Sequence, residues 1–201
     1  MSLVILVSGG LDSTLMSLLA HEEGIEIFPL FIDYGQLCAE KEWQTCRRMH
    51  AKHRLPQPVF MNLQGYGNLI PSGITDAKLR INEDAFLPGR NLLLIIAGAG
   101  YAYYVKANGV AIGLLNEKDM IFPDQSSKFL KECEKIIKCA VGWHIRVVAP
   151  LITLSKQEVI EMAIKHGIEG TYSCHSGKEK PCGVCVSCVE TNTALKKLKG
   201  G

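Results

Sequence analysis

The 201-residue sequence predicts an α/β fold: a doubly wound, mostly parallel sheet with helices on both faces. Two observations support this fold class. Short apolar runs alternate with helix-like segments along the chain, and the first apolar run ends in a glycine-rich turn. No internal repeat or low-complexity tract interrupts this pattern. We expect one main domain over residues 1–170 and a small cysteine-rich segment over residues 171–201.

The first elements follow from hydrophobic periodicity and from glycine positions. Residues 3–7 form a short apolar run closed by glycines, which is typical of a buried strand. Residues 12–23 place leucines on one helical face, and Gly24 stands where a helix C-cap is expected. Residues 25–33 predict a second strand. Pro29 inside it favours an edge or a bulge, because proline cannot donate a ladder hydrogen bond.

The later elements continue the alternation of strands and helices. Residues 64–90 are rich in glycine and proline without periodicity, so a long loop is expected there. Residues 155–166 predict a helix opened by a capping box, with Ser155 at the N-cap and Glu158 three residues later. The other expected elements are helices over 39–53, 91–106, 128–141 and 187–199, and strands over 58–63, 109–114 and 145–150.

Composition and charge limit the classes of protein to consider. The chain is 47% hydrophobic and 21% charged, with a formal net charge of +2, as in ordinary soluble proteins. No apolar run approaches the ~18 residues of a membrane span. The N-terminus lacks a basic region and a small-residue cleavage site. We expect a cytoplasmic protein with neither a membrane nor a nucleic acid as partner.

The turn after the first apolar run predicts an anion site. It reads Ser8-Gly9-Gly10-Leu11-Asp12-Ser13-Thr14 and leads into the first helix. Glycines let backbone N–H groups approach an anion, and a helix N-terminus adds partial positive charge. The sequence of this turn does not match the P-loop pattern GxxxxGK[ST], the dinucleotide-binding pattern GxGxxG or the nucleophile-elbow pattern GxSxG. A phosphate or pyrophosphate cradle is favoured, and a plain turn capped by Asp12 or Ser13 is the alternative.

Four of the eight cysteines lie within fifteen residues near the C-terminus, at Cys174, Cys182, Cys185 and Cys188. Their spacing predicts a tetrahedral zinc site, and four protein ligands make such a site structural. An iron–sulfur cluster and free structural cysteines are the alternatives. His175 is expected to be a neutral neighbour rather than a ligand. The other cysteines are expected to be buried hydrophobic residues.

The sequence resembles a known family in several segments. SGGLDS is similar to the SGGxDS signature of the PP-loop ATP pyrophosphatases, which hold the pyrophosphate of ATP during attack on the α-phosphorus. The chain resembles the 7-cyano-7-deazaguanine synthase (QueC) family over nearly its whole length. Five further segments carry this resemblance: "FIDYGQ", "FLPGRN", "GLLNEKDMIFPDQSSKF", "VVAPLITLSKQEVI" and "YSCHSGKEKPCGVCVSC".

The resemblance implies an adenine nucleotide alpha-hydrolase-like fold and an ATP-dependent ligase that uses ATP, Mg²⁺ and Zn²⁺. In that family, ATP adenylates the carboxylate of 7-carboxy-7-deazaguanine, ammonia displaces AMP to give an amide, and a second adenylation gives the nitrile. The implied partners are therefore a deazaguanine and ammonia. A homodimer is also implied.

The resemblance also assigns roles to individual residues. Ser8, Asp12, Ser13 and Lys156 would be catalytic. The nucleotide and its magnesium would be bound by Ser8, Gly9, Gly10, Leu11, Asp12, Ser13, Thr14, Asp33, Tyr34, Gln36, Arg90 and Asp124. Three alternatives remain open: Asp33 and Tyr34 could form a strand-ending turn, Arg90 could be a surface arginine, and Lys156 could be a solvated helix lysine.

Two segments depart from the family pattern. Residues 120–126 read MIFPDQS where the family shows a sequence like SGYPDCR, so only Pro123 and Asp124 match. Leu37 and Cys38 stand where basic residues are usual. Adenylation is therefore better supported than the nitrile product. A reaction that stops at the amide, or that attaches a deazaguanine to a partner protein as in divergent members of bacterial defence operons, is the alternative. Other rivals are tRNA thiolation or lysine addition, and a non-catalytic zinc module that binds nucleotides.

Overall fold

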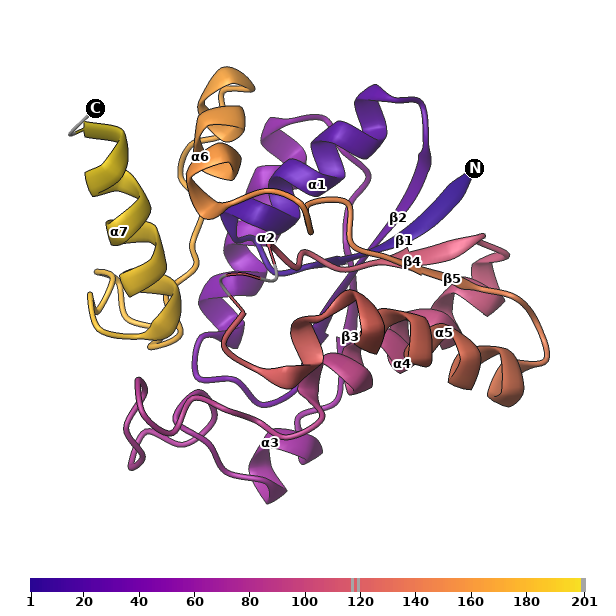
Figure 1. Ribbon diagram of the computed structural model, residues 1–201, viewed down its shortest axis with the longest axis horizontal. Helices are drawn as coiled ribbons and strands as arrows, with labels where there is room; N and C mark the ends of the chain where they lie inside the picture. Colours follow the sequence, from indigo (N-terminus) through magenta and orange to yellow (C-terminus); the bar gives the residue numbers. More distant parts are fainter. Residues whose placement is uncertain (117, 119, 200–201) are drawn as a thin grey trace.

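A five-stranded parallel sheet forms the centre of the computed structural model, which describes residues 1–116, 118 and 120–199 (Figure 1). The strand order is β3-β2-β1-β4-β5, and every neighbouring pair is parallel. The strands are β1 (Ser2–Val7), β2 (Glu26–Asp33), β3 (Val59–Asn62), β4 (Gly109–Ala111) and β5 (Arg146–Val148). The doubly wound parallel fold predicted from the sequence is confirmed.

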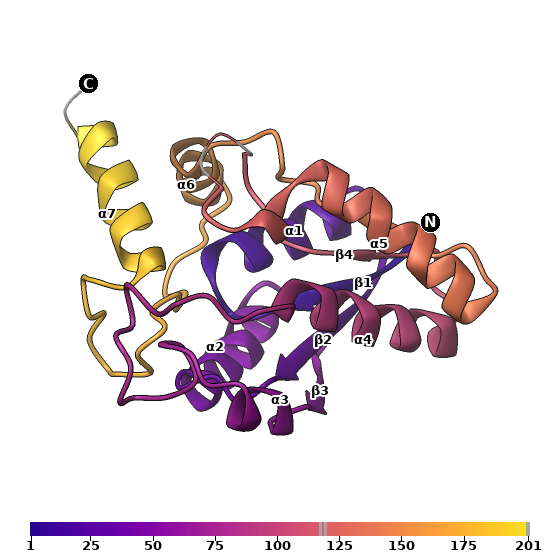
Figure 2. The same ribbon diagram turned by 60° about the horizontal axis from the view of Figure 1, so that its bottom comes forward.

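Helices cover both faces of this sheet (Figures 1 and 2). One core cluster lies under α1 (Leu11–Glu22), α2 (Ala39–Lys52) and α6 (Lys156–Lys165). The other lies under α4 (Arg90–Val105) and α5 (Ser127–Val141). The side chains of β1 divide between them, because Leu3, Ile5 and Val7 face the first cluster and Val4 and Leu6 face the second. No helix of the described residues is long and apolar enough to cross a membrane.

The remaining elements lie at the carboxyl ends of the strands or beyond them. They are α3 (Gly65–Leu69), the short 3₁₀ helix η2 (Pro123–Gln125) and α7 (Val186–Lys199). Both views show α7 beside α6, outside the layered part of the molecule. The cysteine-rich segment lies between α6 and α7 in the chain, and it returns toward the loop that follows β1, where the Tyr172 N–H donates to the Gly9 oxygen at 3.1 Å.

Local signals placed several helix ends correctly. Ser155 caps α6, since its hydroxyl accepts the Glu158 N–H, and Glu158 accepts the Ser155 N–H at 2.7 Å. Gly24 follows the end of α1 with φ of +71°. By contrast, α1 begins at Leu11 with Gly10 at its N-cap and no side-chain cap, so the plain turn capped by Asp12 or Ser13 is not formed.

One expectation about loops needs correction, and one about strands holds only locally. The loop over residues 64–90 contains the helix α3, although glycine disfavours helices. A tertiary contact fixes it, because the Gly67 N–H donates to the Tyr34 oxygen at 2.8 Å and a Cβ at Gly67 would lie 2.4 Å from that oxygen. Pro29 lies in an interior strand, but at a position where that strand is locally an edge of the ladder. The ladder with β3 begins only at Leu30, so β2 is paired with β1 alone at Pro29.

Gly9 is the residue around which the first loop and α2 pack. Its φ is +77°, and a Cβ there would lie 2.6 Å from the Cys46 nitrogen and 2.8 Å from the Glu42 oxygen. Both atoms belong to the backbone of α2, so neither can yield without moving the helix. The loop therefore needs glycine at position 9 for its backbone conformation and for the close approach of α2.

Gly9→Ala should destabilise the protein by about 3 kcal/mol or more, because strain and backbone overlap add together. Gly24→Ala is the matched control. It has a similar φ of +71° but nothing within 4 Å of the added Cβ, so it should cost about 1 kcal/mol. Denaturant unfolding of both variants measures the difference. If both variants lost the same free energy of unfolding, the overlap of the added Cβ with the backbone of α2 would contribute nothing to the destabilisation.

Candidate functional site

A cavity of about 290 Å³ opens at the carboxyl ends of β1, β2 and β4. The chain runs from β1 outward to β3 and then returns to place β4 on the other side of β1. Ligands of open parallel sheets bind at this point, where the strand order reverses. The floor is apolar and is formed by Leu6, Leu30, Ile32, Ile112 and Leu114.

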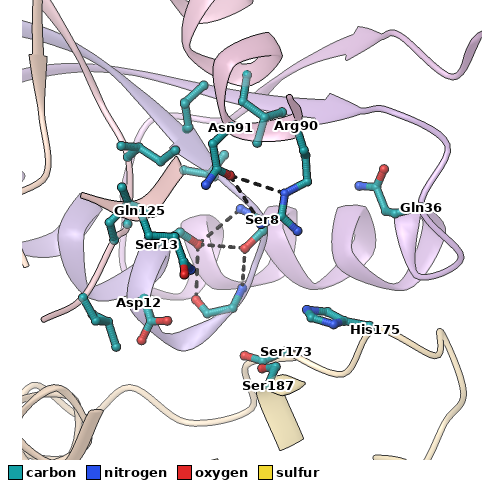
Figure 3. Close-up of a pocket in the computed structure, with 18 of the residues that line it drawn as sticks. Ser8, Asp12, Ser13, Gln36, Arg90, Asn91, Gln125, Ser173, His175 and Ser187 are labelled. Atoms are coloured by element: carbon teal, nitrogen blue, oxygen red, sulfur yellow. Dashed lines mark hydrogen bonds between the residues drawn. The ribbon is translucent and has the colours of Figure 1, made fainter. Parts of the chain in front are cut away.

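Polar side chains from separate parts of the chain face this cavity (Figure 3). Ser8 and Ser13 lie in the middle of the group, with Arg90 and Asn91 on one side and residues of the cysteine-rich segment on the opposite side. Gln36 and His175 lie to one side of Ser8, whereas Asp12 lies to the other. The cavity therefore has two polar ends separated by the first loop.

The loop after β1 is closed by its own hydroxyl groups. The Ser8 N–H donates to the Ser13 Oγ at 3.2 Å, and the Gly10 N–H faces the Ser8 Oγ at 3.3 Å. The first helical hydrogen bond of α1 runs from the Thr14 N–H to the Gly10 oxygen at 3.1 Å. The preceding N–H groups at the start of the helix have no partner within it, which is the usual arrangement at an anion site.

Asp12 and Lys156 form an ion pair at one end of the cavity. The Lys156 Nζ lies 2.7 Å and 2.8 Å from the two Asp12 carboxylate oxygens. Lys156 is only 6% exposed, which excludes the alternative of a solvated helix lysine.

The residues after β2 divide into two groups. Asp33 is buried, accepting the Gly35 N–H at 2.9 Å and the Gln64 Nε2–H at 2.6 Å, so it forms the strand-ending turn that was the alternative to ligand contact. Tyr34 lines the cavity, and burial raises the pKa of its phenol far above the usual range despite the nearby Arg90 charge. Tyr34 is therefore neutral and available as a hydrogen-bond donor.

Arg90 and Asn91 begin α4 at the rim of the cavity. The Arg90 guanidinium donates to the Asn91 Oδ1 at 3.3 Å, and the Asn91 Nδ2–H donates to the Asp124 backbone oxygen at 3.0 Å. Arg90 faces the cavity rather than bulk solvent alone. Asp124 does not line the cavity, but Phe122 and Gln125 beside it do.

Seven of the predicted residues line the cavity: Ser8, Gly10, Asp12, Ser13, Tyr34, Gln36 and Arg90. The lining does not include Gly9, Leu11, Thr14, Asp33, Asp124 or Lys156. Gly9 packs on α2, Leu11 on the core, and the Thr14 hydroxyl donates to the Gly10 oxygen at 2.8 Å. Lys156 reaches the site only through Asp12.

Sequence reasoning missed Glu42. This carboxyl group lines the cavity from α2, accepts the Gln36 Nε2–H at 3.1 Å, and belongs to none of the sequence motifs described above. Burial raises the pKa of Glu42 to about 7, although hydrogen bonds from Gln36 and Cys38 and the charge of Arg90 oppose the rise. Nothing in the sequence separates Glu42 from Glu40, an exposed carboxyl on the same helix.

The cysteine-rich segment supplies another wall of the cavity. Ser173, His175, Val186, Ser187 and Glu190 line it. Burial and the charge of Arg90 lower the pKa of His175 to about 4, so the ring is neutral, as expected. Its Nδ1 is buried and has no hydrogen-bond partner among the described residues.

The four predicted cysteines come together in one cluster. The sulfur atoms of Cys174, Cys182, Cys185 and Cys188 all lie within 4.8 Å of one another. Ligands at the Zn–S distance of ~2.3 Å in a tetrahedron are about 3.8 Å apart, so the cluster fits such an ion. Burial opposes ionisation of Cys174, but hydrogen bonds from Ser176 and Cys182 lower its pKa to about 6. The cluster packs against Cys38 and Tyr172.

A family model described as "Queuosine biosynthesis protein QueC" matches residues 2–199. The chain belongs to the QueC family. Among QueC relatives, it is 33% identical over 200 residues to the 7-cyano-7-deazaguanine synthase of Desulfitobacterium hafniense, covering 92% of this chain and 84% of that one. It is 32% identical to the 7-cyano-7-deazaguanine synthase of Methanothermobacter thermautotrophicus, covering 98% and 95%.

Solved structures place this QueC chain in a wider fold group. NMN synthetase from Francisella tularensis superposes with a TM-score of 0.53 at 16% identity, covering 98% of this chain and 76% of that one. The U34-tRNA thiolase NcsA from Methanococcus maripaludis, with its [4Fe-4S] cluster, gives 0.52 at 13% identity, covering 98% and 72%. At these identities the likeness shows the shared fold alone.

The cysteine cluster predicts about one zinc ion per chain, and Cys185→Ser should lose the metal together with much of the folding stability. Cys139→Ser is the control, because Cys139 is exposed on α5 and lies outside the cluster. Elemental analysis and denaturant unfolding measure the two effects. Iron with a visible absorption band would instead indicate an iron–sulfur cluster.

Glu42 predicts a pH dependence of stability. Its folded pKa of about 7 exceeds the ordinary value of 4.5, so between these values the folded state holds a proton that the unfolded state has lost. Stability should therefore fall as the pH rises from 4.5 to about 7 and then level off. Glu42→Gln should remove this pH dependence. At a pH above the folded pKa, it should raise the free energy of unfolding by at most about 3 kcal/mol.

Denaturant unfolding across this pH range checks the Glu42 prediction. Glu40→Gln is the matched control, because Glu40 is an exposed carboxyl on the same helix. The control should keep the slope of the wild-type protein. If Glu42→Gln also kept that slope, the carboxyl group would be ionised in the folded protein throughout the range.

Proposed function

We propose that this QueC protein adenylates the carboxylate of 7-carboxy-7-deazaguanine with ATP and transfers the acyl group to ammonia. One observation supports this most strongly. The loop after β1, with its free helix N–H groups and its hydroxyls, opens into the same cavity as a second group of polar side chains. The choice of a deazaguanine as the substrate follows from the names of the QueC relatives.

The proposed chemistry proceeds in balanced steps. A carboxylate oxygen of the substrate attacks the α-phosphorus of ATP, and pyrophosphate leaves. Ammonia then attacks the acyl carbon, a proton is lost, and AMP leaves to give the amide. The amide oxygen then attacks the α-phosphorus of a second ATP, and pyrophosphate leaves. Loss of AMP and two protons from this intermediate gives the nitrile.

The chain's own residues would neutralise charge and position the reactants, which are the main requirements of phosphoryl chemistry. The N–H groups at the start of α1 and the hydroxyls of Ser8 and Ser13 would hold the pyrophosphate. Arg90 would contact an anionic oxygen of the nucleotide or of the acceptor, because its guanidinium can bind two oxygens at once. Ser8 and Ser13 are assigned to binding, since among the described residues their hydroxyls are hydrogen-bonded to each other and to Gly10 and not to a base that would make either a nucleophile.

Asp12 is the carboxylate of the loop that could hold Mg²⁺, which prefers oxygen ligands. Bound magnesium would neutralise the charge on the phosphates. Lys156 now occupies both Asp12 oxygens, so we expect it to move from the carboxylate toward the phosphates when the metal–nucleotide complex binds. The zinc-binding cysteines would hold the wall that carries Ser173 and His175.

The segment that departs from the QueC pattern also reaches the cavity. Met120, Phe122 and Gln125 line it, and Gln125 lies on the same side of Ser8 as Asp12 (Figure 3). The relatives compared here are named for the cyano product, and none of their names refers to a protein acceptor or to defence. Mass spectrometry of the product separates nitrile, amide and protein conjugate.

The purified protein with ATP, Mg²⁺, ammonia and 7-carboxy-7-deazaguanine should release AMP and pyrophosphate. Asp12→Asn should lower kcat/KM by about 100-fold or more, because the loop loses its carboxylate and Lys156 loses its partner. Glu23→Gln, at the opposite exposed end of the α1 region, is the control and should keep full activity. Release of ADP and phosphate, or full activity of Asp12→Asn, would contradict the proposal.

A further inference from the structure

The carboxyl group of Glu42 lies at the polar end of the cavity away from Asp12. It comes from α2. The Gln36 amide donates to it, the charge of Arg90 acts on it, and its own charge acts on Tyr34. Figure 3 shows that Gln36 and His175 lie on the side of Ser8 opposite Asp12. The nucleotide and metal chemistry described above uses the other end and leaves Glu42 without a role.

Gln36 holds Glu42 in a fixed orientation. The Gln36 Oε1 accepts the Tyr34 N–H at 2.9 Å, and its Nε2 donates to the Ile32 oxygen at 3.3 Å and to the Glu42 Oε2 at 3.1 Å. The oxygen and both hydrogens of the Gln36 amide thus have partners inside the protein. Gln36 is therefore a support for Glu42 rather than a group that contacts a ligand directly.

The charge of Arg90 acts on Glu42, but the two groups form no direct ion pair. No salt bridge within the described ranges includes it, whereas Asp12 at the other end is paired with Lys156. Cys38 also donates to Glu42, but a thiol is a weak donor. A desolvated carboxyl group with only neutral donors is costly unless a bound ligand adds stronger hydrogen bonds.

Guanine-type rings offer such donors. Their N1–H and 2-amino groups lie side by side on one edge, and a carboxylate can accept from both at once. An adenine ring presents an unprotonated nitrogen at the same position, which an ionised carboxylate repels. The edge of the deazaguanine therefore complements Glu42 better than the base of ATP does.

We propose that Glu42 is a specificity-determining residue that accepts hydrogen bonds from the N1–H and 2-amino groups of a guanine-type ring, with Gln36 as its positioning residue. The inference rests on the proposed function for the identity of the ring. The raised pKa of Glu42 agrees with it, because two donors on the ligand would stabilise the charged form and release a proton on binding.

Calorimetric titration with 7-deazaguanine and with 7-deazahypoxanthine, which lacks the 2-amino group, tests the inference. The wild-type protein should bind 7-deazaguanine about 100-fold more tightly. Glu42→Gln should reduce this preference to less than about 10-fold, since an amide presents one acceptor instead of two. Glu40→Gln, an exposed carboxyl on the same helix, should keep the wild-type preference.

Titration with a non-hydrolysable ATP analogue separates the ring site from the nucleotide site. Its affinity should stay within about threefold in Glu42→Gln and in Gln36→Met, while Gln36→Met loses most of the 2-amino preference. If Gln36 had only a structural role, Gln36→Met would bind both 7-deazaguanine and the ATP analogue more weakly. Loss of ATP-analogue affinity in Glu42→Gln, with the ring preference intact, would overturn the inference and assign Glu42 to the adenine base.

The wild-type titrations alone can overturn the inference, whatever the variants do on folding. Equal affinity for the two bases, or no measurable binding of either, would contradict it. Selective binding of 7-deazaguanine, with no AMP formed from ATP when 7-carboxy-7-deazaguanine is present, would support the inference and contradict the proposed reaction. If AMP formed equally fast with carboxylate substrates that carry the 2-amino group and with ones that lack it, the proposed reaction would be supported and the inference contradicted.

Discussion

The close approach of backbones at Gly9 is the constraint on which the rest of the site depends. A side chain at this position would overlap the Cys46 nitrogen and the Glu42 oxygen of α2. The Gly9 oxygen also accepts the Tyr172 N–H, which ties the cysteine-rich segment to the same point. One residue without a side chain thus brings together the loop after β1, the helix that carries Glu42 and the wall that carries Ser173 and His175.

This arrangement gives the cavity two differently charged ends. At one end Asp12 is neutralised by Lys156, so its charge is available only when another cation replaces the lysine. At the other end Glu42 is supported by Gln36 without an ion pair, and Arg90 and neutral His175 lie in the same wall. An anionic nucleotide suits the first end, and a ligand that carries hydrogen-bond donors suits the second. The Ser8 and Ser13 hydroxyls lie between the two (Figure 3).

The sequence predicted the parts of the molecule whose signals are local. Alternating apolar runs identified the parallel sheet, the Ser155 capping box fixed the start of α6, and the spacing of the four cysteines identified their cluster. Contacts between distant segments were not predictable. The helix α3 forms in a glycine-rich stretch because Gly67 hydrogen-bonds to Tyr34, and Asp33 turns away from the cavity because Gln64 and Gly35 bind it.

Glu42 illustrates the same limit at the site. In the sequence it is one acidic residue of a charged helix, and nothing in its spacing separates it from Glu40, which is exposed. Only the packing of α2 against Gly9 brings its carboxyl group into the cavity. Lys156 is the reverse case, because its expected place near the phosphates depended on a family resemblance, and the structure buries its ammonium group against Asp12.

We expect the loop from Ser8 to Ser13 to hold the phosphates of ATP and Lys156 to leave Asp12 when they bind. A crystal structure with Mg²⁺ and an ATP analogue that cannot be cleaved between the α- and β-phosphorus atoms tests this most directly. We expect to find the β- and γ-phosphates on the N–H groups at the start of α1, the α-phosphorus facing the end that holds Glu42, and Lys156 on a phosphate oxygen. A nucleotide bound elsewhere, or an Asp12–Lys156 pair that stays intact beneath bound phosphates, would contradict it.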